Sequence, residues 1–193
     1  MGLNDELIIG YAGSLGPAQG LVNVCDAAEI LEKRNFNNIK FIFLGEGDDK
    51  ELIQSRGNKL NNLIYLGNKN RALIPNYIAD FDIGLAHLNA SPVWKTTIPS
   101  KIFELMASKL PILLVSPKGE ASEIVEKYDV GKWVMSGDPE LLAKRIEEMV
   151  MNKENLAKFA KNSSRTSLTF SREEQSRKVI EVVEKVISSR IKI

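Results

Sequence analysis

Residues 7–33 read LIIGYAGSLGPAQGLVNVCDAAEILEK, and this stretch sets the pattern of the whole chain. The apolar run at residues 7–12 predicts a buried strand, and glycines punctuate the loop at residues 13–20. Apolar side chains then return at helical spacing over residues 21–33, at Val22, Cys25, Ala28, Ile30 and Leu31. A strand, a glycine-bearing loop and a helix in this order form the first part of a crossover between parallel strands.

The same alternation continues to about residue 135. Further strands are predicted at residues 39–44, 63–66, 82–88, 112–116 and 131–135. Helices are predicted between them, at residues 48–56, 73–79 and 121–128 and from Ser100 onward. Six strands that alternate with helices predict one α/β domain of the Rossmann-like, doubly wound type, in which helices cover both faces of a parallel sheet.

From about residue 139 the pattern is purely helical, with segments at residues 139–151, 153–161 and 172–189. Ser171, with Glu174 three residues later, predicts a capping box for the last helix. The apolar positions of that helix are too many for a solvated tail: Val179, Val182, Val183, Val186 and Ile187. They should pack on this domain or, without a partner, stay partly exposed and promote self-association; we favour local packing with the end left exposed. We therefore expect a single domain over residues 1–193 with a helical tail from about residue 139.

The composition argues against several classes of protein. Lysine plus arginine number 26 against 25 for aspartate plus glutamate, so no strongly basic balance indicates nucleic acid binding. A single cysteine excludes a disulfide framework and a cysteine metal site, and it fits a reducing cytoplasm. No apolar run approaches the ~18 residues that a membrane-spanning helix needs. We expect a cytoplasmic protein without a transmembrane segment.

A second informative stretch, residues 98–111, reads IPSKIFELMASKLP. Pro99 and Ser100 are helix start signals, with a fixed φ and a hydroxyl that we expect to cap the helix. The unpaired N–H groups of the first turn favour a phosphate, and Lys101 adds a full positive charge there. Glu104 lies one turn further along, where its carboxylate can accept hydrogen bonds from a diol such as ribose. The stretch therefore predicts a nucleotide site.

Further candidate residues follow the strands, because ligands of open parallel sheets bind outside the carboxyl ends of the strands. These residues are Gly13, Ser14 and Gly16 after the first strand, Gly45, Glu46 and Gly47 after the second, and Asn68 and Lys69 after the third. The glycines would let a ligand approach backbone N–H groups. Two alternatives stay open: each glycine only permits a tight turn, and Glu46 is only a solvated loop residue.

The loop at residues 13–20 matches neither of two common phosphate fingerprints. It lacks both the Gly-x-Gly-x-x-Gly pattern of dinucleotide binding and the Lys-Ser or Lys-Thr of a P-loop, which disfavours NAD chemistry and ATP hydrolysis. His87 is either a pocket group or a packed imidazole. Trp94 either stacks on a ligand ring or pins its loop to the core. No clustered metal ligands are visible, so we expect no metal site.

Taken together, these motifs resemble the C-terminal half of the glycosyltransferases of family 4, the group 1 glycosyltransferases, which have the two-domain GT-B fold. The resemblance covers about residues 8–190 and rests on residues 11–16, 19–21, 43–47, 64–67, 79–85 and 99–107, which occur in the family's order. It implies a donor-binding half that holds a nucleotide diphosphate sugar. It also implies an N-terminal, acceptor-binding domain that these residues do not include.

The resemblance further implies a metal-independent, retaining hexosyl transfer to a polysaccharide or lipid-linked acceptor. Glu104 matches the family residue that hydrogen-bonds the ribose, and Lys101 is expected to stabilise the leaving diphosphate. The first Glu of the family motif falls at Thr96, and Ser14 and Gln19 stand where many relatives carry Arg and Lys. We therefore assign charge compensation to Lys101 and the helix start, with Lys69 and Lys95 in reserve. Peripheral association with the inner face of the membrane is one option for the full enzyme.

Two other functions stay open at this point. One is half of a GT-B sugar-nucleotide epimerase, which shares the fold and takes its catalytic groups mostly from the other half. The other is a non-catalytic regulatory or interaction domain of the flavodoxin type. A receiver domain would need a phosphorylatable Asp at the end of the third strand, where Leu66, Gly67 and Asn68 stand instead.

Overall fold

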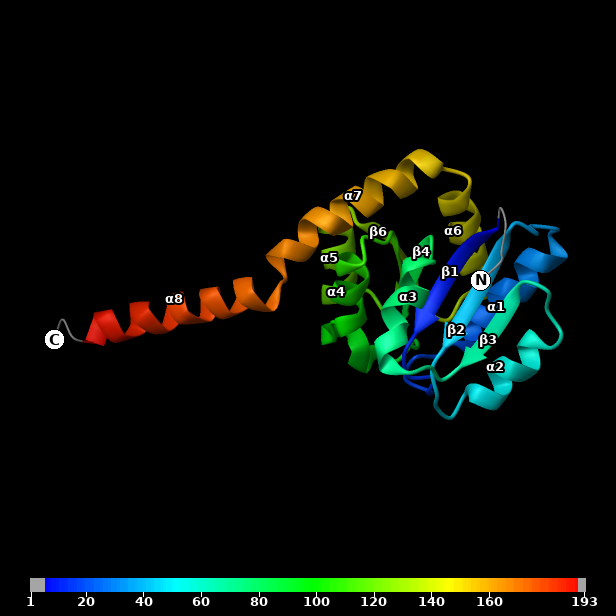
Figure 1. Cartoon of the computed structure of the whole chain (residues 1–193), viewed down its shortest axis with the longest axis horizontal. Helices are drawn as coiled ribbons and strands as arrows, with labels where there is room; N and C mark the ends of the chain where they lie inside the picture. The colour runs from blue at the N-terminus through cyan, green and yellow to red at the C-terminus, as the bar shows by residue number, and fades with distance from the viewer. Residues whose placement is uncertain (1–5, 191–193) are drawn as a thin grey trace.

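A six-stranded parallel sheet forms the centre of the molecule, whose computed structural model describes residues 6–190 (Figure 1). The strand order is β3-β2-β1-β4-β5-β6. The chain adds β2 and β3 on one side of β1 and then β4, β5 and β6 on its other side, so the strand order reverses between β1 and β4. The strands are β1 (Leu7–Ala12), β2 (Ile39–Leu44), β3 (Leu63–Gly67), β4 (Ile83–His87), β5 (Ile112–Ser116) and β6 (Gly131–Met135). In doubly wound sheets a ligand binds beside such a reversal, at the carboxyl ends of the strands.

Helices cover both faces of the sheet, as the alternating sequence pattern predicts. One buried cluster joins the sheet to α1 (Val22–Lys33), α2 (Lys50–Gly57) and α6 (Pro139–Val150). The other joins it to α3 (Ile74–Ala79), α4 (Ser100–Ala107) and α5 (Glu120–Lys127). Two short 3-10 turns, η1 (Arg71–Leu73) and η2 (Pro92–Thr96), precede α3 and α4. The predicted Rossmann-like fold with six parallel strands is confirmed.

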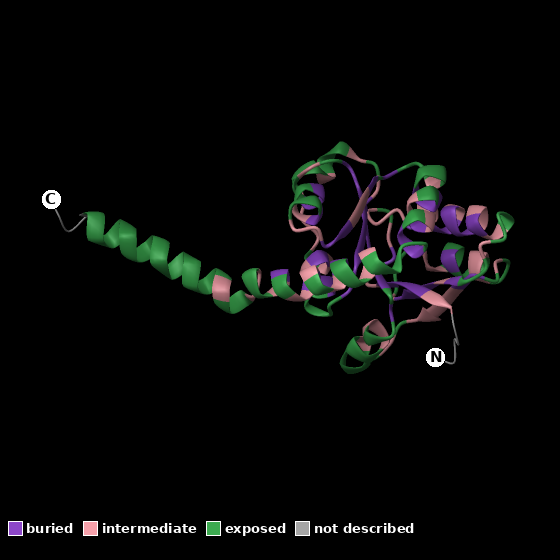
Figure 2. Cartoon of the chain, turned by 90° about the horizontal axis from the view of Figure 1, so that it is seen from above, coloured by how far each residue is buried: buried purple, intermediate pink, exposed green. Residues whose placement is uncertain are grey.

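Strand burial explains why the sequence pattern was informative. Every residue of β4 and β5 is buried, because helices lie on both sides of these central strands. A strand in that position reads as an uninterrupted apolar run, and such runs locate all six strands to within one residue. Figure 2 shows the buried strands enclosed between partly exposed helices.

The tail departs from expectation in its length. Helix α7 (Lys153–Thr169) continues eight residues beyond the predicted end at residue 161. Its second half is held by small polar side chains that face the core: the Ser163 hydroxyl donates to the Leu110 carbonyl oxygen at 2.8 Å, and Thr166 is buried. An apolar periodicity cannot reveal a helix face built from serine and threonine.

The expected local packing of the last helix is wrong. Helix α8 (Arg172–Arg190) extends away from the domain, and its apolar positions are 49–62% exposed (Figures 1 and 2). Phe170 anchors its base, with ring centroids 4.8 Å from Phe103 and 5.3 Å from Tyr128, but the domain offers no surface beyond that point. Within residues 6–190, no helix is both long and apolar enough to cross a membrane.

Only half of the predicted capping box forms at the start of α8. The Glu174 N–H donates to the Ser171 hydroxyl at 3.2 Å, while the Glu174 carboxylate pairs with Arg177 rather than with the backbone. The helix start therefore has one side-chain cap, and Glu174 is paired with Arg177 at 2.6 Å and Lys178 at 3.8 Å.

Candidate functional site

The loops that follow β1, β2 and β3 continue the hydrogen-bonding ladder of the sheet. The Gly13 N–H donates to the Leu44 carbonyl oxygen at 2.9 Å, and the Gly45 N–H donates to that of Gly67 at 3.2 Å. Because the loops are bonded to one another as strands are, their backbones are fixed before any ligand arrives. This rigid edge lies at the carboxyl ends of the strands, where the fold places ligands.

Gly45 is the position at which a side chain would break this edge. Its φ of +142° is unfavourable for other residues, and a Cβ atom built on it would fall on the Gly13 carbonyl oxygen. The first two loops therefore touch through backbone alone.

A pocket of about 340 Å³ opens among these loops. It is lined by Ala12, Gly13, Ser14, Leu44, Gly45, Glu46, Asn68, Lys69, Arg71 and Ile74. The structure thus brings together six of the residues predicted from sequence: Gly13, Ser14, Gly45, Glu46, Asn68 and Lys69. Glu46 is also paired with Lys50 at 3.2 Å, which leaves its charge partly compensated.

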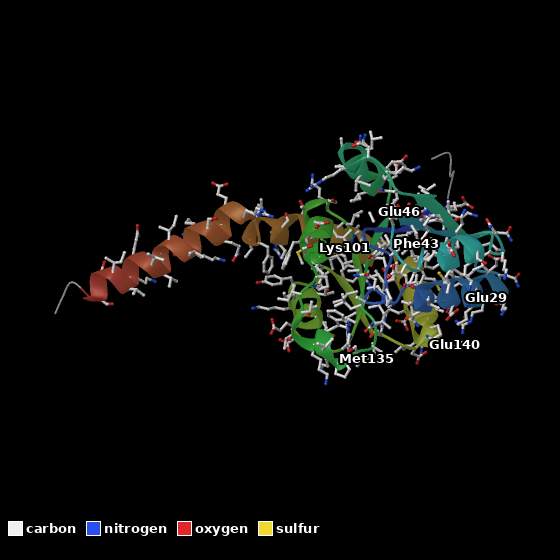
Figure 3. The ribbon with its side chains drawn as sticks, turned by 90° about the horizontal axis from the view of Figure 1, so that it is seen from below. Glu29, Phe43, Glu46, Lys101, Met135 and Glu140 are labelled. Atoms are coloured by element: carbon white, nitrogen blue, oxygen red, sulfur yellow. The ribbon has the colours of Figure 1, made fainter. Side chains whose placement is uncertain are left out.

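Lys101, from the other half of the sheet, contacts the pocket-lining residues Ala12 and Gly13 but does not itself line the pocket. Its Nζ donates to the Ala12 carbonyl oxygen, lies 4.6 Å from the centroid of the Tyr11 ring, and would be 2.5 Å from a Cβ atom on Gly13. Figure 3 shows Lys101 and Glu46 near the middle of the molecule, one from α4 and the other from the loop after β2. Burial of the ammonium lowers the pKa of Lys101, and the Glu104 carboxylate partly opposes that shift. The amine of Lys101 is thus held at the junction of β1 and α4.

The Tyr11 side chain supports the same junction from below. Its hydroxyl donates to the Ser14 carbonyl oxygen at 2.7 Å, and burial raises the pKa of the phenol. The neutral phenol therefore fixes the loop that carries Gly13 and Ser14, while its ring lies under the ammonium of Lys101.

The start of α4 differs from the sequence prediction in one respect. Ser100 is the first helical residue and Pro99 occupies the capping position, so the serine hydroxyl caps no backbone group. It bonds instead to the exposed Glu104 carboxylate at 3.2 Å. The predicted hydroxyl cap is therefore wrong, although Ser100 and Glu104 do lie together on the first turn.

Several predicted site residues do not line the pocket. Pro99, Ser100, Lys101 and Glu104 are all absent from its lining, and of these four Lys101 contacts the lining residues Ala12 and Gly13. The Gly16 carbonyl closes the loop by accepting from the backbone N–H of Gln19 at 2.9 Å. Gly47 lies against the backbone of Leu15. Neither Gly16 nor Gly47 lines the pocket, so for these two residues both alternatives, ligand approach and a tight turn, stay open.

Sequence reasoning missed Arg71 and Ile74, which line the pocket from η1 and α3. Arg71 lies two residues after Lys69 in the same connection, so extending the third loop by that distance would have included it. With Lys69, it gives this side of the pocket two positively charged side chains.

The sequence left two roles open for each of His87 and Trp94, and neither residue lines the pocket. The Trp94 Nε1–H donates to the Asn89 Oδ1 at 2.7 Å, a bond within the loop at residues 89–97. His87 is buried, with Nε2 3.2 Å from the Asn23 Oδ1, and burial lowers its pKa to about 4. It is a neutral, packed imidazole at physiological pH.

A larger cleft, of about 760 Å³, lies at the amino ends of the strands, next to α7 and opposite the first pocket. Its lining includes Glu6, Asp82, Lys109 and Lys153. We place the candidate site at the smaller pocket, because that one has glycine-lined backbone, a convergent lysine and the carboxyl-end position. Among residues 6–190, no three His, Cys, Asp or Glu side chains come together in a way that could hold a metal ion.

Solved structures with the same fold include HepE of Anabaena in complex with UDP, at a TM-score of 0.77 and 23% identity over 95% of this chain and 50% of that one. The C-terminal domain of LpcC from Francisella tularensis matches at a TM-score of 0.67 and 20% identity. That alignment covers 87% of this chain and 86% of that domain. The architecture is thus that of one domain of GT-B glycosyltransferases.

Two curated relatives are both named as glycosyltransferases. WbjE of Pseudomonas aeruginosa is 28% identical over 72% of this chain, and EpsD of Bacillus subtilis is 24% identical over 86% of it. The chain spans 34% of WbjE and 42% of EpsD. The family model described as "Glycosyl transferases group 1" matches residues 2–166. The chain therefore belongs to the group 1 glycosyltransferase family, and it spans less than half the length of these two curated relatives.

Proposed function

We propose that this chain is the donor-binding domain of a retaining glycosyltransferase that moves a sugar from a nucleoside diphosphate sugar to a polysaccharide or lipid-linked acceptor. The observation that carries the proposal is the meeting of Lys101 with the Gly13 loop at the carboxyl ends of β1 and β4. That meeting point combines a positive charge, a helix start and a rigid glycine backbone. These are the groups that bind a diphosphate.

The dimensions of the site support a nucleotide. A pocket of about 340 Å³ lies within the range typical of small-molecule sites. In our proposal the diphosphate lies over Gly13, Ser14 and Lys101, and the ribose lies within reach of Glu104. Asn68 and Lys69 line the pocket that takes the remainder of the donor. HepE and TarM, which share the fold, were crystallised with UDP.

The proposed chemistry depends on the leaving group. As the bond between the sugar and the diphosphate breaks, negative charge grows on the phosphate oxygens. A preorganised ammonium stabilises that charge more than it stabilises the bound donor, and such differential stabilisation lowers the barrier by several kcal/mol. We assign this role to Lys101, without a metal ion. In our proposal Glu104 turns from its contact with Ser100 to accept hydrogen bonds from the ribose.

The acceptor requires a second surface, because transfer needs the attacking hydroxyl held against the anomeric carbon. We propose that an N-terminal domain supplies it, as in a two-domain enzyme, and that this chain alone binds donor but transfers no sugar. A location in the cytoplasm, at the inner face of the membrane, would suit a polysaccharide or lipid-linked acceptor.

The test is a titration of the isolated chain with UDP, GDP and ADP, followed by backbone amide shifts in the presence of EDTA. We expect saturable shifts at residues 13–16 and 100–104 for at least one of the three ligands. A matched titration with inorganic sulfate would show which shifts arise from any anion. If no nucleotide perturbs the amides around Lys101, the site assignment is wrong. If chelation abolishes binding, the metal-free part of the proposal is wrong.

The activity arm uses the same chain with a nucleotide sugar, with and without the preceding domain supplied in trans. We expect acceptor glycosylation only when both domains are present. Robust transfer by these 193 residues alone would overturn the half-enzyme proposal.

A further inference from the structure

One side chain connects the two loops that enclose the proposed diphosphate position. Asn89, just after β4, donates from Nδ2 to the Pro17 carbonyl oxygen at 2.8 Å, and its backbone N–H donates to the Ala18 carbonyl oxygen at 2.9 Å. Its Oδ1 accepts from the Trp94 Nε1–H at 2.7 Å and from the Ser91 N–H at 2.9 Å. The N–H donors of Asn89 thus bond to the loop at residues 13–20, and its side-chain oxygen bonds within the loop at residues 89–97.

The two loops also meet by close backbone approach at this point. Gly20 has a φ of +58°, and a Cβ atom built on it would lie 2.9 Å from the Cβ of Asn89 and 3.1 Å from its Cα. A larger residue at position 20 would push the loops apart. The separation of the loops near Asn89 is therefore fixed by packing as well as by hydrogen bonds.

Each loop leads directly to a group that the proposed site uses. Residues 13–20 begin with Gly13 and Ser14, which line the pocket. Residues 89–97 run through η2 to Pro99 and the first turn of α4, which carries Lys101. The contact at Asn89 therefore ties the loop that begins with Gly13 to the loop that leads to Lys101.

We propose that Asn89 is a positioning residue, which sets the spacing between the Gly13 loop and Lys101 and so the fit of a diphosphate. The inference rests on the proposed function, because it assumes that a diphosphate bridges these two groups. Asn89 does not line the pocket, so it acts through the loops rather than on the ligand. A change of spacing alters the contacts of the phosphates, which meet both loops, and leaves the proposed ribose contact of Glu104, which comes from α4 alone.

Two substitutions test the Nδ2 and Oδ1 hydrogen bonds of Asn89 separately. Asn89→Asp keeps Oδ1 for Trp94 and Ser91 but places a second oxygen against the Pro17 carbonyl, which loosens the Gly13 loop. Trp94→Phe removes one donor to Oδ1 and leaves the contact with Pro17 intact. We expect Asn89→Asp to weaken UDP binding about tenfold, and Trp94→Phe to weaken it about threefold, as loss of hydrogen bonds of ordinary strength predicts. Uridine affinity should change less than twofold in both variants.

Asn62→Asp is the matched control. Asn62 is a buried asparagine whose Nδ2 donates to the Ala28 carbonyl oxygen at 2.8 Å, at the opposite end of β3 from the pocket. This variant should lower the melting temperature and leave the ratio of UDP to uridine affinity at the wild-type value. It therefore separates a general loss of stability from a change in spacing.

Titration calorimetry with uridine and UDP on folded protein, verified by circular dichroism, decides between the outcomes. A selective loss of UDP affinity in both Asn89→Asp and the neutral Trp94→Phe supports the positioning role, whereas a loss confined to Asn89→Asp is explained by its added negative charge and overturns it. Equal losses of affinity for uridine and UDP, or no loss, overturn the positioning role. The proposed function would still stand in that case, because the wild-type chain binds UDP. Absence of UDP binding by the wild-type chain overturns the proposed function itself, and this inference with it.

Discussion

Replacing Lys101 by methionine should separate ligand affinity from stability. The substitution keeps a long apolar stem and removes the ammonium, which donates to the Ala12 carbonyl oxygen and lies 4.6 Å from the Tyr11 ring centroid. Losing the hydrogen bond costs about 1 kcal/mol, and losing the cation–π contact costs about 0.5–2 kcal/mol. Relief of a partly buried charge offsets these losses by a similar amount. The free energy of unfolding should therefore stay within about 1 kcal/mol of wild type.

Affinity for a diphosphate should respond far more strongly. A charge-assisted hydrogen bond contributes about 1.5–3 kcal/mol, so Lys101→Met should weaken UDP binding about 10- to 150-fold. The affinity for UMP should fall by a smaller factor, and the affinity for uridine hardly at all, because the ammonium is proposed to contact phosphate alone. The rising series of losses from uridine to UDP is the signature of a phosphate-specific contact.

The assay is titration calorimetry with the three ligands, together with chemical denaturation of the unliganded variant. Lys161→Met, at an exposed position on α7 far from the pocket, serves as the control for removing a lysine charge. UDP affinity at the wild-type level in Lys101→Met would refute the assignment of Lys101 to the diphosphate. Equal losses for all three ligands would show instead that the variant disturbs α4.

Three further predictions concern other groups. Glu104→Gln should weaken uridine and UDP by similar factors of about 3 to 10, because it removes a ribose contact rather than a phosphate contact; an unchanged uridine affinity would contradict that role. Gly45→Ala should destabilise the fold by about 2–4 kcal/mol in urea denaturation, because its Cβ would collide with the Gly13 carbonyl oxygen. Gly67→Ala is its control, since Gly67 has a positive φ but open space, and should cost only about 1 kcal/mol. Folding lowers the pKa of His87 from 6.5 to about 4, so stability should be complete above pH 6.5 and fall by about 3 kcal/mol as the pH drops to 4. His87→Gln should remove that slope, and identical pH profiles for the two proteins would disprove the assignment.

The strands and the class of fold were predictable because each central strand is an apolar run bounded by turn residues. The pocket was partly predictable for the same reason, since its residues follow strand ends that topology gathers at one edge. Arg71 was missed because nothing local marks how far the third loop remains at the pocket. The hydroxyl of Ser100 was misassigned because Pro99 and Ser100 compete for one capping position, and only the backbone geometry decides between them.

The tail was the least predictable part because its packing depends on surfaces that the local sequence does not describe. Ser163 and Thr166 look like solvent-facing residues in α7 and are buried. Val179 and Ile187 look like core residues in α8 and are exposed. Side-chain polarity indicates which face of a helix prefers water, but the presence of a neighbouring surface decides what each face contacts.

The backbone bonds that tie the Gly13 and Gly45 loops to their neighbours have a consequence for the entropy of binding. Fixing one residue of a flexible loop costs about 1–2 kcal/mol, and a nucleotide that had to order both loops would lose much of its affinity to that cost. Here folding has already ordered them. A ligand at this edge should therefore bind with little loss of chain entropy, and amide hydrogen exchange at Gly13 and Gly45 should be slow in the free protein and change little when the pocket is filled.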